Sequence, residues 1–475
     1  MKKTLAIILT LVLCLGCLFG CGGGVDKTKK KAQADSDDTI VTVWSTAGGA
    51  QAVWEELVDD YNSTTGDEKN VFIDWKTMME ASAADVAQQS GQLPEILNIS
   101  GTRLIKYQQS GDLAAIEELP GGKELLEEYD FPGVEGTNVF DGKQYTLQRS
   151  ATTAGLVYNK DLFKKAGIVD KNGEAKAPET MSEMREAAKK IQALGGGVYG
   201  FAFPLKFGTS WTVNTPTANS FDLDTPAAVT DLDALTVTYS GYKDKFQWVL
   251  DMKKDGTVFP GAESLDNDTA RAYFSSGIIG MIPGASWDVG VYTTQFPAEC
   301  DWDVCRFPIL DGYEFTENSM SIGGGLAISR NALKNEKIAQ ATMEAYKFIY
   351  SLETRTELFE RGIEISCKTD VLESVDKSKL DPRLVKFAEF VPENMLRYPS
   401  EKYAIEGENW DALFQKVWIG DITLEAAIKD IETRATAGLR KAVKDGSYDV
   451  ARQKQTDAQK RADFEAKKAA KSKEN

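Results

Sequence analysis

The sequence contains no histidine among its 475 residues, and this absence excludes several kinds of chemistry. A Ser-His-Asp or Cys-His nucleophilic site, a zinc site with histidine ligands and an imidazole general base all need that side chain. Basic residues are fewer than acidic ones, 55 against 72, so the formal net charge is -17. Because the phosphates of nucleic acids require a basic surface, this balance argues against a nucleic-acid partner.

Cysteine is also scarce, and three of the six cysteines lie within the first 21 residues. Cys300, Cys305 and Cys367 remain, an odd number that does not make a disulfide framework. Cys300 and Cys305 either pair or stay as thiols, and no CxxC metal motif occurs. We expect no metal and no cofactor.

The N-terminus begins with two lysines and an apolar run over residues 5–20, which predicts a secretory signal peptide over residues 1–20. The run is shorter than the roughly 20 residues that a membrane span needs. Its end, LFGC, resembles the lipobox of bacterial lipoproteins, so we expect Cys21 to carry the lipid (palmitate), with Cys17 as the second candidate and a plain cleaved signal as the alternative. Residues 21–38 are rich in Gly, Lys, Asp and Ser, which is typical of a flexible tether. The lipid alone would then hold the protein at the outer face of the membrane.

Charge is distributed unevenly along the chain. Between the tether and Val450 the sequence holds 41 basic and 64 acidic side chains, so the body is strongly acidic. An anionic lipid surface repels such a body. Residues 446–475 form a charged tail, in which eight basic and four acidic groups fall in the last 25 residues. Its composition predicts a frayed, exposed helix or disorder, with a wall-binding or lipid-binding role as an alternative.

Strand and helix patterns alternate from residue 39 onward. Residues 39–44, 71–75 and 95–99 read as strands, with helical patterns between them. This alternation predicts an α/β fold with mostly parallel sheets. An Asp-Gly pair at 141–142 predicts a hairpin, and Thr180 with Glu183 forms a capping box that opens a helix.

Four further segments appear in one order along the chain: FDGKQYTLQRSATTAGLVYNKDLFKKAGI (140–168), APETMSEM (177–184), GMIPGASW (280–287), and Trp410 followed by VWIGDITLEAA (417–427). In this order they resemble the sugar-type extracellular solute-binding proteins of bacterial ABC importers, the maltose-binding-protein-like group (family 1). The resemblance spans about residues 39 to 440.

The resemblance implies a two-lobed, periplasmic-binding-protein-like fold (type II), with a ligand cleft between two α/β lobes. The first lobe would comprise residues 39–150 and 322–362, and the second residues 153–318 and 368–445. Crossovers would fall near residues 149–153, 319–324 and 362–368. The glycine run at 323–325 suits a hinge, because glycine absorbs φ/ψ changes at little cost.

Sugars are bound by aromatic faces and by polar groups that hydrogen-bond the hydroxyls. Tryptophans are core residues by default, and Trp54, Trp75 and Trp248 on apolar periodic faces fit that role. Polar candidates follow the ends of strands, where open α/β sheets bind ligands. The ligand-binding candidates are Trp44, Ser45, Thr46, Glu80, Asn98, Ser100, Arg149, Phe207, Trp211, Trp287, Asp288 and Trp410.

The resemblance implies a monomeric receptor that captures a carbohydrate and delivers it to the transmembrane subunits of an ABC permease. A polyamine or a small peptide is the alternative ligand, because an acidic body with aromatic residues also suits cations. A carboxylate-dependent glycosidase is the alternative from another class. No catalytic motif supports it, and Ser286 in GASWD lacks both the second glycine of a nucleophile elbow and a histidine. We therefore expect no enzymatic activity.

Overall fold

The computed structural model describes residues 32–45, 50–77, 82–131, 133–316, 320–323, 325–368, 370–391 and 401–474. The predicted signal peptide, Cys21 and most of the tether lie outside these residues. None of the helices in these ranges is long and apolar enough to cross a bilayer.

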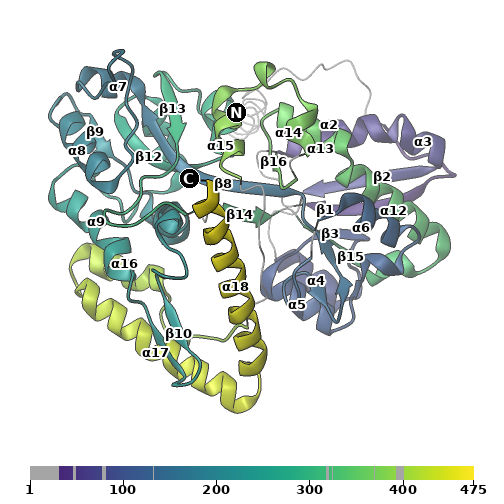
Figure 1. Ribbon diagram of the computed structural model, residues 1–475. Coiled ribbons are helices and arrows are strands. Elements are labelled where there is room, and N and C mark those ends of the chain that lie inside the picture. Colours follow the sequence, from purple (N-terminus) through teal and green to yellow (C-terminus); the bar gives the residue numbers. More distant parts are fainter. Residues whose placement is uncertain are drawn as a thin grey trace, which may run out of the picture.

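The chain forms two sheet-centred bodies that lie side by side (Figure 1). The first sheet has the order β2-β1-β3-β15-β4, with β7 also paired to β15. β1 is parallel to both β2 and β3, and its alternately buried residues confirm the strand predicted from the 39–44 pattern. The strands are β1 (Thr39–Ser45), β2 (Val71–Thr77), β3 (Ile96–Asn98), β4 (Leu113–Ala114), β7 (Thr146–Leu147) and β15 (Leu326–Ser329). The helices of this half are α2 (Gln51–Asn62), α3 (Thr65–Lys69), α4 (Ser82–Gln89), α5 (Gly101–Gln109), α6 (Gly122–Tyr129), α12 (Glu336–Tyr350) and α13 (Leu352–Glu360).

The second sheet has the order β13-β8-β12-β9. Only β9 and β12 are parallel, because β8 runs antiparallel to both of its neighbours. The α/β class holds, but both sheets are mixed rather than mostly parallel as predicted. In this half β8 enters from the other half of the molecule and runs against the local strands, and in the first sheet β15 runs antiparallel to β3, β4 and β7. The strands are β8 (Ser150–Asn159), β9 (Tyr199–Phe201), β12 (Ile279–Ala285) and β13 (Trp302–Cys305). The helices of this half are α7 (Lys160–Lys165), α8 (Met181–Gln192), α9 (Tyr242–Lys254), α10 (Asn267–Ser275), α11 (Asp288–Gly290), α15 (Pro382–Glu389), α16 (Trp410–Ile419) and α17 (Leu424–Asp445).

Strand β8 belongs to two sheets at once. Its first residues pair with β14 (Met320–Gly323) on one side and with β16 (Ile365–Ser366) on the other. Its remaining residues, from Ala154 to Asn159, pair with β12 and β13. These three strands fall in the segments expected to cross between the lobes, whereas the residue boundaries of the lobes stay a prediction.

Separate apolar cores support the two halves. Trp54 is 1% exposed in the first core and stacks on Trp75 with 4.6 Å between the ring centroids. Trp248 is buried in the second core, against Phe203. The structural roles predicted for these three tryptophans are confirmed.

Two local motifs also form as predicted. Asp141 and Gly142 both have positive φ in the turn between β5 (Val139–Phe140) and β6 (Lys143–Gln144), as the favoured hairpin turns require. The Thr180 hydroxyl accepts a hydrogen bond from the Glu183 amide at 3.2 Å and caps α8. The Glu183 carboxylate in turn accepts one from the amide of Glu179.

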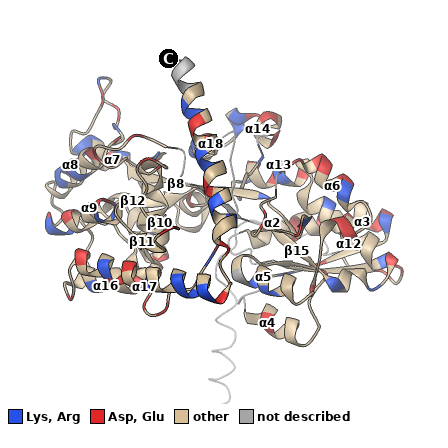
Figure 2. Ribbon diagram, turned by 60° about the horizontal axis from the view of Figure 1, so that its bottom comes forward, with Lys and Arg blue, Asp and Glu red and all other residues tan. Residues whose placement is uncertain are grey.

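The charged tail forms a helix, α18 (Val450–Glu474), that carries both signs of charge (Figure 2). Arg461 and Lys468 pair with Asp224, which holds the helix on the second half. Nearer its start, Arg452 lies 3.9 Å from Glu135, a residue that precedes β8. The remaining described elements are β10 (Val229–Asp231), β11 (Thr236–Thr238), α14 (Asp370–Ser374) and short 3-10 and π-helical turns.

Two tyrosine hydroxyls of α12 bridge the backbones of β7 and β15, next to the start of β8. The Tyr346 hydroxyl accepts from the Leu147 amide at 3.2 Å and donates to the Leu326 carbonyl at 2.7 Å. The Tyr350 hydroxyl accepts from the Leu326 amide at 3.0 Å and donates to the Leu147 carbonyl at 2.5 Å. Burial raises the pKa of Tyr350 to about 12, so this hydroxyl keeps the proton that it donates.

We expect Tyr350→Phe to lower the free energy of unfolding by about 1–3 kcal/mol, because it leaves a buried amide and a buried carbonyl without partners. Urea unfolding followed by circular dichroism measures the change. Tyr273→Phe, at a 38% exposed tyrosine, is the control and should stay within about 0.5 kcal/mol of the parent. Equal stability of the Tyr350→Phe protein and the parent would show that these bridges contribute nothing.

Candidate functional site

Two tryptophans of the second half contact each other at the end of β12. Trp287 follows β12 and caps α11, and Trp211 lies in a π-helical turn over Ser210–Asn214. Their rings are 4.7 Å apart between centroids, in a T-shaped arrangement with an interplanar angle of 68°. Both side chains are half-buried, so part of each indole is open to solvent. A second π-helical turn, Val291–Gln295, continues α11, and such turns occur frequently at functional sites.

Two carboxylates, one buried (Asp288) and one half-buried (Asp411), fix the tryptophan segments. The Asp288 carboxylate accepts a hydrogen bond from the Ala285 amide at 2.7 Å and lies 2.5 Å from Arg271 Nη2. Burial raises the pKa of Asp288, against the opposite effect of Arg271. Asp411 accepts hydrogen bonds from both the amide and the hydroxyl of Thr209, at 2.7 and 2.6 Å. Asp288, a predicted ligand residue, is thus occupied in holding the turn that carries Trp287.

A cavity of about 180 Å³ lies beside Trp287, where β8 meets the segment from Gly362 to Ile365. Its described lining includes the hydroxyl-bearing residues Ser150, Thr152 and Ser286 and a single carboxylate, that of Glu364, but no lysine or arginine. Aliphatic residues such as Ile363 and Leu384 also line it, so the cavity is mixed, with one acidic group and hydroxyl-bearing residues beside Trp287.

Arg149, another predicted ligand residue, is bound to Glu364. Its Nε donates to Glu364 Oε1 at 2.6 Å and its Nη2 to Oε2 at 3.3 Å. The guanidinium is buried and lies 4.8 Å from the ring centroid of Trp54. This ion pair joins the segment that enters β8 to the segment that contains β16.

The polar candidates of the first half lie at one edge of its sheet. Ser45 is buried at the end of β1, and Asn98 is half-buried at the end of the parallel neighbour β3. Trp44 is half-buried and packs on the adjacent core cluster, and Ser100 is exposed at the N-cap of α5. Thr46 and Glu80, the other two candidates in these loops, lie outside the described residues.

The remaining aromatic candidates, Phe207 and Trp410, also lie in the second half. Phe207 is 48% exposed in a 3-10 turn four residues before Trp211. Trp410 begins α16 and packs against Tyr242 and Phe246 at 4.8 and 4.9 Å. Its Nε1 is buried and has no hydrogen-bond partner among the described residues.

The sequence alone did not point to Glu364, Ser150 or Thr152 as site residues, and it pointed to Ser286 only as a nucleophile candidate that lacks its partners. The signal for Glu364 was a charged residue between Ile363 and Ile365 in a segment expected to cross between the lobes. An isolated charge in such an apolar stretch needs a partner, and the partner is Arg149.

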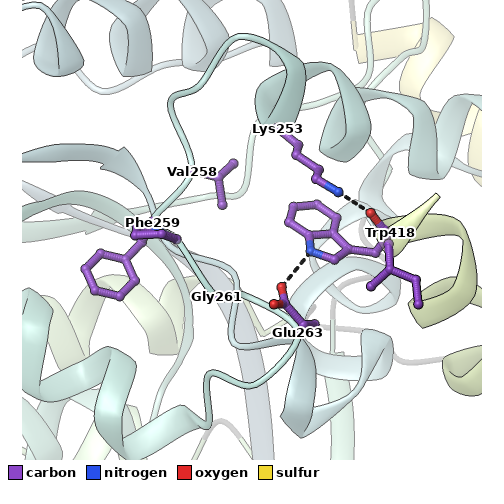
Figure 3. A pocket seen from close by; sticks show the side chains of 8 residues that line it. Lys253, Val258, Phe259, Gly261, Glu263 and Trp418 are labelled. Atoms are coloured by element: carbon purple, nitrogen blue, oxygen red, sulfur yellow. Dashed lines mark hydrogen bonds between the residues drawn. The ribbon is translucent and has the colours of Figure 1, made fainter.

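A larger cavity of about 370 Å³ lies elsewhere on the second half, around Trp418 (Figure 3). Val258, one of its lining residues, forms a β-bridge with Phe201 of β9. In the second sheet β9 is an edge strand, and it lies on the opposite side of β12 from β8. The ammonium of Lys253 lies over the indole ring of Trp418, 4.6 Å from its centroid. The Glu263 carboxylate accepts a hydrogen bond from the indole Nε1 at 3.0 Å. This cavity includes none of the predicted site residues.

Metal and thiol chemistry have little support in the described part of the chain. No group of three or more Cys, Asp or Glu side chains there is placed to hold a metal ion. Cys300 and Cys305 are not joined in a disulfide, and the thiol of Cys367 donates to the carbonyl of Gln148 at 3.3 Å. Burial raises the pKa of Cys300 to about 11 and that of Cys305 to about 12, so both stay protonated near neutral pH.

Comparison with known proteins identifies the family. The bacterial extracellular solute-binding protein family matches residues 45–352, and the chain belongs to this family. It is 26% identical over 344 residues to the sn-glycerol-3-phosphate-binding periplasmic protein UgpB of Brucella abortus, across 70% of this chain and 75% of UgpB. It is 27% identical over 197 residues to the diacetylchitobiose binding protein DasA of Streptomyces coelicolor, across 40% of this chain and 43% of DasA.

Solved structures show the same fold. The maltose/maltodextrin-binding domain MalE of Bdellovibrio bacteriovorus, bound to maltotriose, matches with a TM-score of 0.60 at 18% identity, across 85% of this chain and all of that one. A solute-binding protein of Thermotoga lettingae bound to α-D-tagatose matches with a TM-score of 0.61 at 18% identity, with the same coverage. The two-lobed α/β fold expected from the sequence is confirmed.

Lys245 lies on α9, the helix whose Tyr242 and Phe246 pack against Trp410. It is 8% exposed, and its ammonium lies 5.2 Å from the ring of Phe221 and 5.9 Å from that of Tyr242. No carboxylate of the described residues pairs with it, and burial lowers its pKa to about 8.

We expect Lys245→Met to raise the free energy of unfolding at pH 7 by ~1–3 kcal/mol, because it removes a desolvated cation at the cost of two weaker ring contacts. Between about pH 8 and the ordinary lysine pKa, the unfolded chain holds a proton that the folded chain has released. The stability of the parent rises through that window, so the advantage of the variant shrinks. Urea unfolding at pH 7 and pH 9.5 tests this, with the exposed Lys243→Met as control. A Lys245→Met protein less stable than the parent at pH 7 would contradict it.

Proposed function

We propose that the protein is a lipid-anchored receptor of an ABC importer that binds a mono- or oligosaccharide between its lobes. The observation that carries the proposal is the Trp211–Trp287 pair beside a hydroxyl-lined cavity at the strands that join the two halves. Indole faces match the C–H faces of sugar rings, and hydroxyl and carboxylate groups match the sugar hydroxyls.

The lining favours a neutral ligand over a phosphorylated one. UgpB is named for binding sn-glycerol 3-phosphate, and DasA for binding diacetylchitobiose. A phosphate needs a cation or an array of free amides, and the described lining of the cavity contains no lysine or arginine. Arg149, the nearby cation, is bound to Glu364.

We propose binding without covalent chemistry. The relatives compared above are binding proteins, and no histidine exists to activate Ser286. A glycosidase needs two carboxyl groups across the scissile bond. The described lining supplies only Glu364, which is already ion-paired.

The membrane arrangement rests on the N-terminal sequence. The LFGC end of the apolar run supports a lipid on Cys21, and the tether places the acidic body at the outer face of the cell membrane. The partners in this arrangement are the transmembrane subunits of an ABC permease, which a monomeric receptor would supply with the bound solute.

We expect Trp287→Ala and Trp211→Ala each to weaken saccharide binding by about 10- to 100-fold, because each removes an apolar face worth ~1.5–3 kcal/mol of burial. Isothermal titration calorimetry against a panel of neutral mono- and oligosaccharides measures the loss. Tyr273→Ala, an exposed aromatic residue on the outer helix α10, is the control and should leave the affinity unchanged.

The same titrations can contradict the proposal. If the parent binds no saccharide but binds a polyamine or a peptide with strong salt dependence, the alternative ligand class is correct. If it binds a saccharide and neither tryptophan variant weakens binding, the site is misplaced.

A further inference from the structure

Glu364 lines the cavity and lies on a segment whose backbone is held by strand pairing. The next residue, Ile365, pairs with Ala151 of β8, and Ser366 pairs with Ser150. Gly362 and Ile363 complete the same wall of the cavity. The carboxylate therefore belongs to the residue that directly precedes β16, within the part of the site that joins the two halves.

Arg149 holds this carboxylate in one orientation. Two guanidinium N–H groups donate to the two carboxylate oxygens, at 2.6 and 3.3 Å, which makes a bidentate, charge-assisted contact. The guanidinium is itself fixed by burial and by the ring of Trp54. Each carboxylate oxygen keeps a further lone pair, so Glu364 can still accept hydrogen bonds from a ligand.

Only the negative partner of the pair lines the cavity. Glu364 forms part of the wall together with Ser286 and Trp287, whereas Arg149 is not among the lining residues. No other charged side chain contributes to the described wall. A ligand in this cavity therefore meets an aromatic face, several hydroxyls and one fixed carboxylate.

We propose that Glu364 determines ligand specificity by accepting hydrogen bonds from the hydroxyls of a neutral saccharide and by repelling anionic ligands such as phosphate esters. This inference rests on the proposed function and sharpens it. Because Arg149 prevents the carboxylate from turning away and does not itself line the cavity, an anionic group placed there lies closer to the like charge of Glu364 than to the guanidinium behind it. A sugar hydroxyl in the same position donates to a charged acceptor, the stronger kind of hydrogen bond.

The experiment compares neutral and anionic probes on matched variants of the full mature chain. Isothermal titration calorimetry uses N,N′-diacetylchitobiose and maltotriose as neutral probes and sn-glycerol 3-phosphate as the anionic probe. The variants are Glu364→Gln, which keeps the size and removes the charge, and Arg149→Lys, which keeps the charge pair but not its bidentate geometry. Glu263→Gln, at the carboxylate of the cavity around Trp418, is the control and should bind like the parent.

We expect the parent to bind a neutral saccharide at least tenfold more tightly than sn-glycerol 3-phosphate. Glu364→Gln should lower the affinity for the neutral saccharide by about tenfold. It should also reduce the ratio of the affinities for the neutral and the anionic probe by at least tenfold. If Glu364 only joins the crossing segments, Glu364→Gln and Arg149→Lys will lower the affinities for both probes equally. The ratio of the affinities would then stay unchanged, which would overturn the inference.

The remaining outcomes separate this inference from the proposed function. If the parent binds sn-glycerol 3-phosphate more tightly than either saccharide, the proposed specificity is wrong. The protein would then be a receptor for another class of ligand. Parent protein that binds no carbohydrate, in this test or in the wider panel, would overturn the proposed function and this inference with it. If Glu364→Gln fails to fold, the double variant Arg149→Gln, Glu364→Gln removes both charges together, and the same ratio is measured on it.

Discussion

Strand β8 is the constraint on which the rest of the structure depends, because a single ten-residue segment belongs to the crossing strands and to the second sheet. The side chains of a strand alternate strictly between two faces, so its register at the crossing fixes the register at β12. Ala154 pairs with Ala285, two residues before Trp287, and the position of the indole relative to the crossing strands follows from that pairing. The hydroxyls of Tyr346 and Tyr350 secure the strands that lead into this junction. The site is therefore built at the strands that join the two halves.

Electrostatics then decides what such a site can hold. The chain has no histidine and a strongly acidic body, and the charges near the cavity are arranged in pairs rather than left free. Asp288 is paired with Arg271, and Glu364 with Arg149. The groups left to face a ligand are hydroxyls, indoles and the outer lone pairs of one carboxylate. This set, in the described lining, matches a neutral polyol.

Local features of the fold were predictable from the sequence, whereas features made by distant pairs were not. The first strand, the turn at Asp141 and Gly142 and the cap at Thr180 depend on neighbours a few residues away, and all three formed as predicted. The direction of β8 in the second sheet and the pairing of Arg149 with Glu364, 215 residues further along, depend on the tertiary fold. Asp288 looked like a ligand residue because it follows Trp287, but its hydrogen bond to Ala285 is a property of the folded turn. The family resemblance supplied the two-lobed architecture that local patterns alone left open, while all the ligand-binding residues and the lipid on Cys21 stay predictions.

A crystal structure of the mature protein with a bound neutral saccharide tests the central claim most directly. The account predicts a sugar ring against the indoles of Trp211 and Trp287, with a hydroxyl that donates to Glu364 while Arg149 keeps its contact with that carboxylate. Saccharide density at the cavity around Trp418, or between the lobes but away from both tryptophans, would contradict the account.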